Sequence, residues 1–130
     1  MTTNSKPKIT IVGLGYVGLP LFLDLLLDEN FDVVGYDIDA KKLEILKSGK
    51  NPLKDESATF LDGFIKDVTY ATPDEIDMIK DSKFFIITVP TPVNEDFEPD
   101  YSCVTGAGEA IAPYITKGSY VILESTVNPG

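Results

Sequence analysis

The chain has 130 residues, the usual length of one domain, and its 43% hydrophobic and 25% charged residues are ordinary for a soluble globular protein. Its net charge of −10 opposes binding to nucleic acid or to an anionic membrane surface, and the absence of histidine excludes imidazole catalysis and histidine metal ligands. The single cysteine, Cys103, cannot form an internal disulfide, and no apolar segment is long enough to cross a membrane. We therefore expect a cytoplasmic protein with no nucleic-acid or membrane partner.

The N-terminal part predicts a strand, a glycine-rich turn and a helix in immediate succession. Residues 1–7 form a polar lead that we expect to be flexible, and the apolar, β-branched segment 8–12 predicts a buried strand. Glycines follow at positions 13, 15 and 18. An apolar helical pattern then runs over 16–28, with Pro20 near its opening turn, where proline costs least. This order is typical of a dinucleotide-binding turn.

Strands and helices alternate through the rest of the chain. Further strands are expected at 31–37, 68–71, 83–89 and 119–124. Helices are expected at 39–47, 57–65, 73–81 and 100–115, with a polar loop at 50–56 and an acidic loop at 93–99. In the last helix, Gly106 and Gly108 would be justified by a close helix–sheet contact. The alternation implies right-handed crossovers and a single α/β domain over 8–130: a Rossmann-like, doubly wound parallel sheet of strand order 3-2-1-4-5.

Each glycine of the turn has a separate role if the turn binds a dinucleotide. Gly13 allows the tight reversal, Gly15 lets the backbone approach a pyrophosphate, and Gly18 lets the helix pack closely on the strand. The free N–H groups and the positive dipole end of the helix then hold the anion.

An acidic residue, Asp37, ends the second strand. A carboxylate at this place accepts hydrogen bonds from the adenosine ribose and repels a 2′-phosphate, which favours NAD over NADP. Asp39 is the natural rival, as a helix cap or as the ribose ligand. Lys41 and Lys42 could weaken the preference for NAD, or they could be solvated helix charges.

Other candidate residues each have a simpler structural interpretation. Val89-Pro-Thr-Pro92 could present the Thr91 hydroxyl to a ligand or merely end a strand. Ser125 and Thr126 are paired hydroxyls that could face the ligand or belong to a turn. Cys103 is interpreted as a small buried or half-buried thiol. The acidic residues of 95–100 lack the spacing of a calcium loop and indicate a solvated loop, so no metal site is predicted.

Three motifs together resemble those of the UDP-glucose/GDP-mannose dehydrogenase family, in the family's order and spacing. They are Gly13-Leu-Gly-Tyr-Val-Gly-Leu-Pro20, Val89-Pro-Thr-Pro92, and Glu124-Ser-Thr-Val127 with Pro129-Gly130. The segments Glu98-Pro-Asp100 and Ala110-Ile-Ala-Pro113 are similar as well. The glycine motif alone is generic, but the resemblance as a whole extends from residue 8 to residue 130 and is specific.

The resemblance implies an NAD-dependent oxidoreductase that oxidises the C6 hydroxyl of a nucleotide sugar to a carboxylate, for polysaccharide or cell-envelope synthesis. It assigns the pyrophosphate to Gly13, Leu14, Gly15, Tyr16, Val17 and Gly18, the adenosine side to Asp37 and Lys42, and the nicotinamide side to Val89, Pro90 and Thr91. Ser125 is assigned to the cofactor as well. The neighbouring Thr126 matches the family threonine that contacts the cofactor and helps to position a catalytic water.

The same resemblance places the family's nucleophilic cysteine, lysine and asparagine in later domains, beyond residue 130, so Cys103 is not that cysteine. By itself, this chain is therefore expected to be an inactive monomer, whereas whole family members form homo-oligomers. Two features depart from the family: Lys42 stands where arginine is frequent, and the loop at 49–56 lacks the usual Glu-Pro pair. The Glu98-Pro-Asp100 loop is similar to that of members acting on UDP-N-acetyl-hexosamines.

Two other functions use related sequence patterns. A nucleotide-sensing regulatory module has the same glycine turn and acidic strand end, but has no need of Thr91 and Thr126 near a nicotinamide. A methyltransferase binds S-adenosylmethionine at a glycine-rich turn, and the full 13, 15 and 18 spacing disfavours it.

Overall fold

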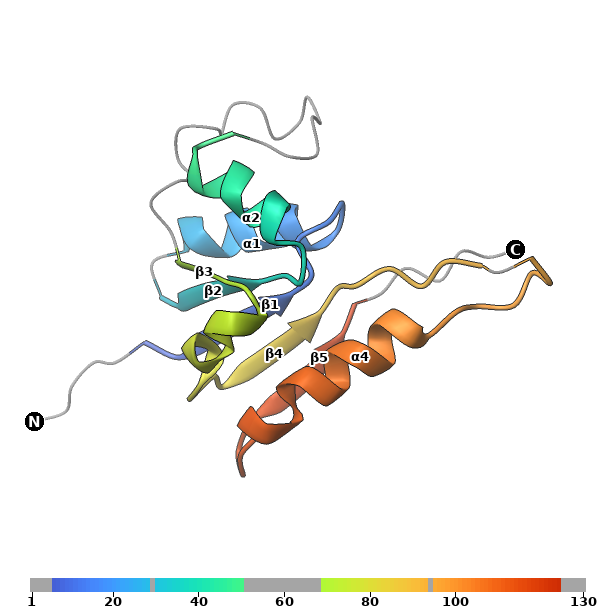
Figure 1. The fold of residues 1–130 in the computed structure, drawn as a ribbon. Coiled ribbons are helices and arrows are strands. Elements are labelled where there is room, and N and C mark those ends of the chain that lie inside the picture. Colours follow the sequence, from blue (N-terminus) through green and yellow to red (C-terminus); the bar gives the residue numbers. More distant parts are fainter. Residues whose placement is uncertain (1–5, 29, 51–68, 94, 125–130) are drawn as a thin grey trace, which may run out of the picture.

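A five-stranded parallel sheet forms the centre of the molecule (Figure 1). The computed structural model describes residues 6–28, 30–50, 69–93 and 95–124. The strands are β1 Lys8–Val12, β2 Asp32–Tyr36, β3 Thr69–Ala71, β4 Phe84–Ile87 and β5 Tyr120–Leu123. Every neighbouring pair is parallel and the order is β3-β2-β1-β4-β5, which confirms the predicted topology.

The register of the central strands creates one common edge. Val12, the last residue of β1, pairs with Tyr36 of β2 and with Ile87 of β4, which are also the last residues of their strands. The three strands therefore end level. Residues 13, 37 and 88, which follow them, leave the sheet side by side.

Helices cover both faces of the sheet, as a doubly wound fold requires. They are α1 Gly18–Leu27, α2 Ala40–Lys47 and α4 Ser102–Ile111, with the 3₁₀ segments η2 Pro73–Ile79 and η3 Ala112–Tyr114. None of these helices has the length and apolarity that crossing a bilayer demands. The helix predicted at 57–65, and all but the first residue of the loop before it, fall outside the described residues.

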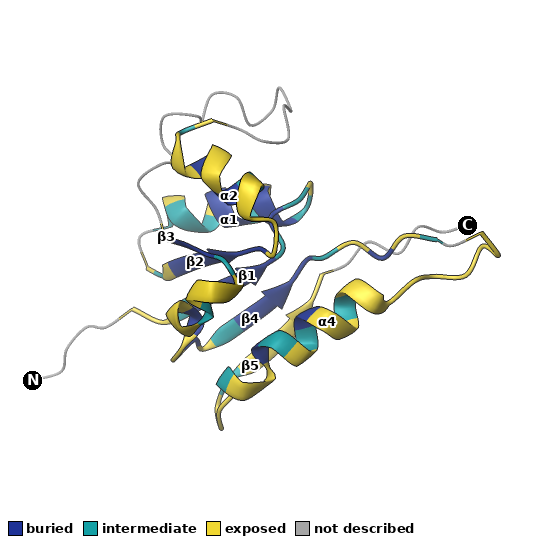
Figure 2. Ribbon diagram, in the orientation of Figure 1, coloured by how far each residue is buried: buried dark blue, intermediate teal, exposed yellow. Residues whose placement is uncertain are grey.

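Two hydrophobic clusters result, one on each face, because successive side chains of a strand point to opposite sides. The first cluster packs α1 and α2 on the sheet, and the second packs η2 and α4 on the other face. Figure 2 shows the buried residues concentrated on the central strands, whereas α4 carries mainly exposed and half-buried residues. All four residues of β5 are also exposed.

Local capping explains where α2 begins and ends. The Asp39 carboxylate accepts a hydrogen bond from the backbone N–H of Lys42 at 3.1 Å, as an N-cap does. At the other end Gly49 has a φ of +90°, and the N–H groups of Gly49 and Lys50 donate to the carbonyls of Leu46 and Ile45. This pair of bonds is a Schellman motif, which glycine permits without strain.

Some predicted boundaries were wrong. The α1 helix starts at Gly18 rather than at residue 16, and α4 ends at Ile111 because Pro113 has no N–H with which to continue it. The helix predicted from Pro73 is a 3₁₀ segment that ends at Ile79.

The predicted reason for the glycines of α4 was also wrong. A Cβ on Gly106 or Gly108 would meet no described atom within 4 Å. Helix–sheet packing therefore does not require glycine at either position.

The contrast between two helical glycines gives a test of the packing. A Cβ on Gly18 would overlap the carbonyl oxygen of Gly13 and the hydroxyl of Thr88. Gly18→Ala is therefore expected to lower the free energy of unfolding by about 2–3 kcal/mol through overpacking. The control Gly108→Ala should raise it by roughly 0.5–1 kcal/mol through helix propensity. Urea denaturation measures both, and equal shifts for the two variants would contradict the close approach of α1 to the sheet.

Candidate functional site

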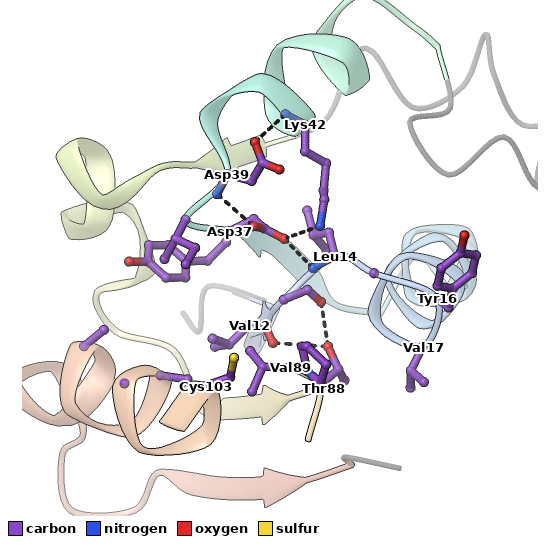
Figure 3. Close-up of a pocket in the computed structure, with 18 of the residues that line it drawn as sticks. Val12, Leu14, Tyr16, Val17, Asp37, Asp39, Lys42, Thr88, Val89 and Cys103 are labelled. Carbon is purple, nitrogen blue, oxygen red and sulfur yellow. Dashed lines mark hydrogen bonds and ion pairs between the residues drawn. The ribbon is translucent and has the colours of Figure 1, made fainter. Parts of the chain in front are cut away.

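A pocket of about 880 Å³ opens at the carboxyl edge of the central strands. Four segments line it: the glycine turn, the residues after β2 with Lys42 of α2, the residues after β4, and one side of α4 (Figure 3). Open α/β sheets bind their ligands in this crevice, outside the carboxyl ends of the strands, where the direction of chain winding reverses.

The glycine turn forms one wall of the pocket. Gly13 has a φ of +100°, a conformation that favours glycine, and its N–H donates to the carbonyl of Tyr36 at 2.8 Å. A Cβ on Gly15 would meet no described atom within 4 Å. Nothing in the described protein thus demands glycine at position 15, but a ligand lying against the turn would. Tyr16 and Val17 also line the pocket.

The N-terminus of α1 is suited to an anion. Its N-cap residue, Val17, makes no side-chain capping bond, and the first turn holds no acidic residue. The N–H groups of Leu19 and Leu21 donate to the carbonyls of Gly15 and Val17, and Pro20 has no N–H. The partial positive charge of this helix end would therefore attract an anion. Among the described residues, therefore, no side chain competes with a ligand for this end of α1.

Asp37 occupies the centre of the site and is buried, with 7% of its surface exposed. Its Oδ2 accepts hydrogen bonds from the backbone N–H of Leu14 at 2.8 Å and from Lys42 Nζ at 3.2 Å, and its Oδ1 accepts from the N–H of Asp39 at 2.9 Å (Figure 3). Three donors hold the carboxylate in one orientation. A carboxylate has about four acceptor positions, so one remains for a ligand hydroxyl.

The roles of the neighbouring charged residues also become distinct. Asp39 caps α2, while its rival Asp37 lies deeper in the pocket and joins the turn to β2. Lys42 forms an ion pair with Asp37, whereas Lys41 is exposed and does not line the pocket.

The end of β4 supplies the opposite wall. Val89 and Pro90, both predicted as site residues, line the pocket. Thr91, predicted with them, is buried and does not line it. The preceding residue, Thr88, was not predicted, yet its hydroxyl donates to the carbonyls of Gly13 at 2.6 Å and Val12 at 3.1 Å. Ser125 and Thr126 lie outside the described residues.

One side of α4 completes the pocket, and the sequence analysis missed it. The lining residues Cys103, Gly106, Ala107 and Ala110 follow the three- and four-residue spacing of a single helix face. Their small side chains leave space in front of the sheet. Cys103 is exposed, so its interpretation as a buried or half-buried thiol was wrong. The helix turns it toward the open pocket rather than toward the core.

The acidic loop lies in solvent, apart from the site. Val93 and Pro99 form an antiparallel bridge, and the N–H of Asp100 donates to the carbonyl of Pro92 at 2.7 Å. The Asp100 carboxylate accepts a bond from the N–H of Ser102, which lowers the pKa of that carboxyl and supports the start of α4.

Comparisons with known proteins agree with this geometry. Residues 7–130 match the NAD binding domain of the UDP-glucose/GDP-mannose dehydrogenase family. A UDP-N-acetyl-D-glucosamine 6-dehydrogenase of Salmonella typhi is 38% identical over 124 residues, which are 95% of this chain and 28% of that protein. A UDP-N-acetyl-D-mannosamine dehydrogenase of Methanococcus aeolicus is 36% identical over 129 residues, or 94% of this chain and 28% of that protein.

Solved structures show the same likeness. The UDP-D-ManNAc dehydrogenase of Pyrococcus horikoshii superposes with a TM-score of 0.80 at 31% identity, covering 95% of this chain and 29% of that one. A GDP-mannose dehydrogenase from Pseudomonas aeruginosa, solved as a ternary complex, gives a TM-score of 0.78 at 26% identity. The match covers 94% of this chain and 29% of that one. The chain thus spans less than a third of the length of these proteins.

The thiol in the pocket reports whether a ligand occupies it. Cys103 is the single cysteine of the chain and lines the pocket. NAD at ten times its Kd should therefore slow alkylation of Cys103 by about tenfold, because only the free protein reacts. The rate is followed with a chromogenic thiol reagent.

A control thiol can be placed on the same helix, away from the pocket. Glu109 is exposed and is not a lining residue, so a Cys103→Ser, Glu109→Cys variant should react equally fast with and without NAD. Protection of both thiols, or of neither, would contradict binding in this pocket.

Proposed function

Since this chain belongs to the UDP-glucose/GDP-mannose dehydrogenase family, we propose that its pocket binds NAD and that it serves as the NAD-binding domain of a nucleotide-sugar 6-dehydrogenase. One observation carries the proposal. The glycine turn, the uncapped N-terminus of α1 and the buried Asp37 carboxylate all meet at a single pocket. This is the combination that an adenosine diphosphate needs, with an anion beside a ribose.

Each part of NAD has a matching part of the pocket. The open space beside Gly15 and the N-terminus of α1 suit the pyrophosphate, and the remaining acceptor position of Asp37 suits the adenosine ribose. Val89 and Pro90 would lie on the nicotinamide side. When bound there, NAD would supply the hydride acceptor for oxidation of an alcohol.

The pairing of Asp37 with Lys42 supports a preference for NAD over NADP. A 2′-phosphate would be placed beside the Asp37 carboxylate and repelled by it. The ammonium group of Lys42 lies 3.2 Å from Asp37 Oδ2 and already donates to this carboxylate. If Lys42 moved to a phosphate, Asp37 would have one donor fewer.

The reaction and its setting are the wider part of the proposal. The relatives carry the names UDP-N-acetyl-D-glucosamine 6-dehydrogenase and UDP-N-acetyl-D-mannosamine dehydrogenase. We propose that this domain belongs to an enzyme that oxidises the C6 hydroxyl of a UDP-N-acetyl-hexosamine to a carboxylate, for polysaccharide or cell-envelope synthesis. The free thiol of Cys103 fits a reducing compartment such as the cytoplasm.

Calorimetric titration of the chain with NAD and NADP tests the cofactor and its preference. NAD should bind more tightly than NADP. Asp37→Ala should lower the affinity for NAD by at least about tenfold, because hydrogen bonds to a charged group contribute about 1.5–3 kcal/mol. Asp32→Ala is the matched control, since it removes an exposed carboxylate at the opposite end of β2. Binding of S-adenosylmethionine without binding of NAD would instead identify a methyltransferase.

Thr126, which lies outside the described residues, gives the test of the reaction. In an active enzyme that contains this domain, Thr126→Ala should lower kcat by at least about tenfold if the residue positions the water that is deprotonated during the reaction. Ser125→Ala is the neighbouring control and should change kcat less. Unchanged kcat and unchanged NAD affinity for Thr126→Ala would favour a nucleotide-sensing module.

A further inference from the structure

We propose that Thr88 is a positioning residue for NAD binding, because its hydroxyl and the Asp37 carboxylate together hold one peptide unit, the one that joins Gly13 to Leu14. The inference deepens the proposed function and rests on it. It assigns a role to a residue that lines the pocket but belongs to none of the motifs of the sequence analysis.

The two contacts hold the same peptide from opposite sides. The carbonyl oxygen of Gly13 accepts a hydrogen bond from Thr88 Oγ1 at 2.6 Å, and the N–H of Leu14 donates to Asp37 Oδ2 at 2.8 Å (Figure 3). In a trans peptide the C=O and the N–H point in opposite directions. The unit is therefore held between a side chain that follows β4 and a side chain that follows β2.

This peptide would otherwise be free to turn. Gly13 has a φ of +100°, and glycine has no Cβ to restrict rotation on its side of the peptide. A flip would exchange the positions of the C=O and the N–H and direct the carbonyl oxygen toward the Asp37 carboxylate. Asp37 would then lose a donor, and its carboxylate would face a carbonyl oxygen, so the ribose-binding group would no longer be held in one orientation.

The surroundings of Thr88 explain why a hydroxyl is needed and not only bulk. The residue is 5% exposed, and its hydroxyl also contacts the carbonyl of Val12 at 3.1 Å. A Cβ on Gly18 would overlap this hydroxyl, so the start of α1 closes over it. Valine would fill the same volume, but it could not donate a hydrogen bond to Gly13.

The chain offers a matched control in Thr10. This threonine is fully buried on β1, and its hydroxyl lies 2.6 Å from the hydroxyl of Ser82, which donates to the carbonyl of Ile79. It does not line the pocket. Thr10→Val therefore removes a buried hydroxyl from the same sheet without touching the turn.

The experiment compares NAD affinity in Thr88→Val, Thr88→Ser and Thr10→Val by calorimetry, with urea denaturation of each variant. Thr88→Val should lower the affinity for NAD by about tenfold, which is the effect expected for the loss of one or two hydrogen bonds. Thr88→Ser retains the donor and should stay within about twofold of the original chain. Thr10→Val should lower stability and leave NAD affinity unchanged. The double variant Thr88→Val, Asp37→Asn should lose NAD affinity by a smaller factor than the product of the two factors measured for the single variants, because both substitutions act on one peptide.

Hydrogen exchange of the Leu14 amide tests the clamp without any ligand. In Thr88→Val this amide should exchange faster, while the amides of β1 and β4 keep their protection. Three outcomes would each overturn the role of Thr88. Thr88→Val could leave the exchange rate of the Leu14 amide unchanged or leave NAD affinity unchanged. Thr88→Ser could lose as much NAD affinity as Thr88→Val. If Thr88→Val does not fold, Thr88→Ala replaces it in the comparison with Thr88→Ser. Failure of the original chain to bind NAD would overturn the proposed function, and the Leu14 amide would still decide whether the clamp exists.

Discussion

The whole arrangement depends on the close approach of α1 to the ends of β1 and β4. At Gly18 the backbone of the helix lies against the Gly13 carbonyl and the Thr88 hydroxyl, in a space that even a single Cβ would overfill. The first turn of α1 is thereby placed at the carboxyl edge of the sheet. The backbone of residues 15–17, which leads into that first turn, lines the same pocket as the residues that follow β2 and β4.

The charge of the chain makes that position important. With 21 acidic residues against 11 basic ones, the net charge of −10 repels an anion. Lys42 is the single basic residue among the described residues that line the pocket, and it is paired with Asp37. Attraction of a pyrophosphate therefore depends on backbone N–H groups and on the orientation of individual peptides. Control of the Gly13–Leu14 peptide by two buried side chains is consistent with that dependence.

Much of the site could be predicted because its residues follow strand ends or have a fixed spacing. The glycines and Asp37 were predicted in this way. Lys42, Val89 and Pro90 were assigned through the family resemblance, and of these seven residues all but Gly18 line the pocket. Gly18 instead lets α1 pack against the turn. The side of α4 that includes Cys103 was missed, because small residues on a helix predict close packing as readily as they predict open space. Thr88 was missed because one threonine at the end of an apolar strand has no pattern of its own.

The order and direction of the strands, the glycine turn and the family could be predicted from the residues alone. These follow from local periodicity, from strand–helix alternation and from motif spacing, which are written along the chain. Which groups contact one another could be seen only in the folded chain: Thr88 and Asp37 at one peptide, Lys42 at Asp37, and Cys103 at the pocket. Hydrogen bonds are short-ranged and directional. These contacts therefore depend on the level ends of β1, β2 and β4 and on which side α4 turns toward the pocket. No local sequence pattern specifies either of these features.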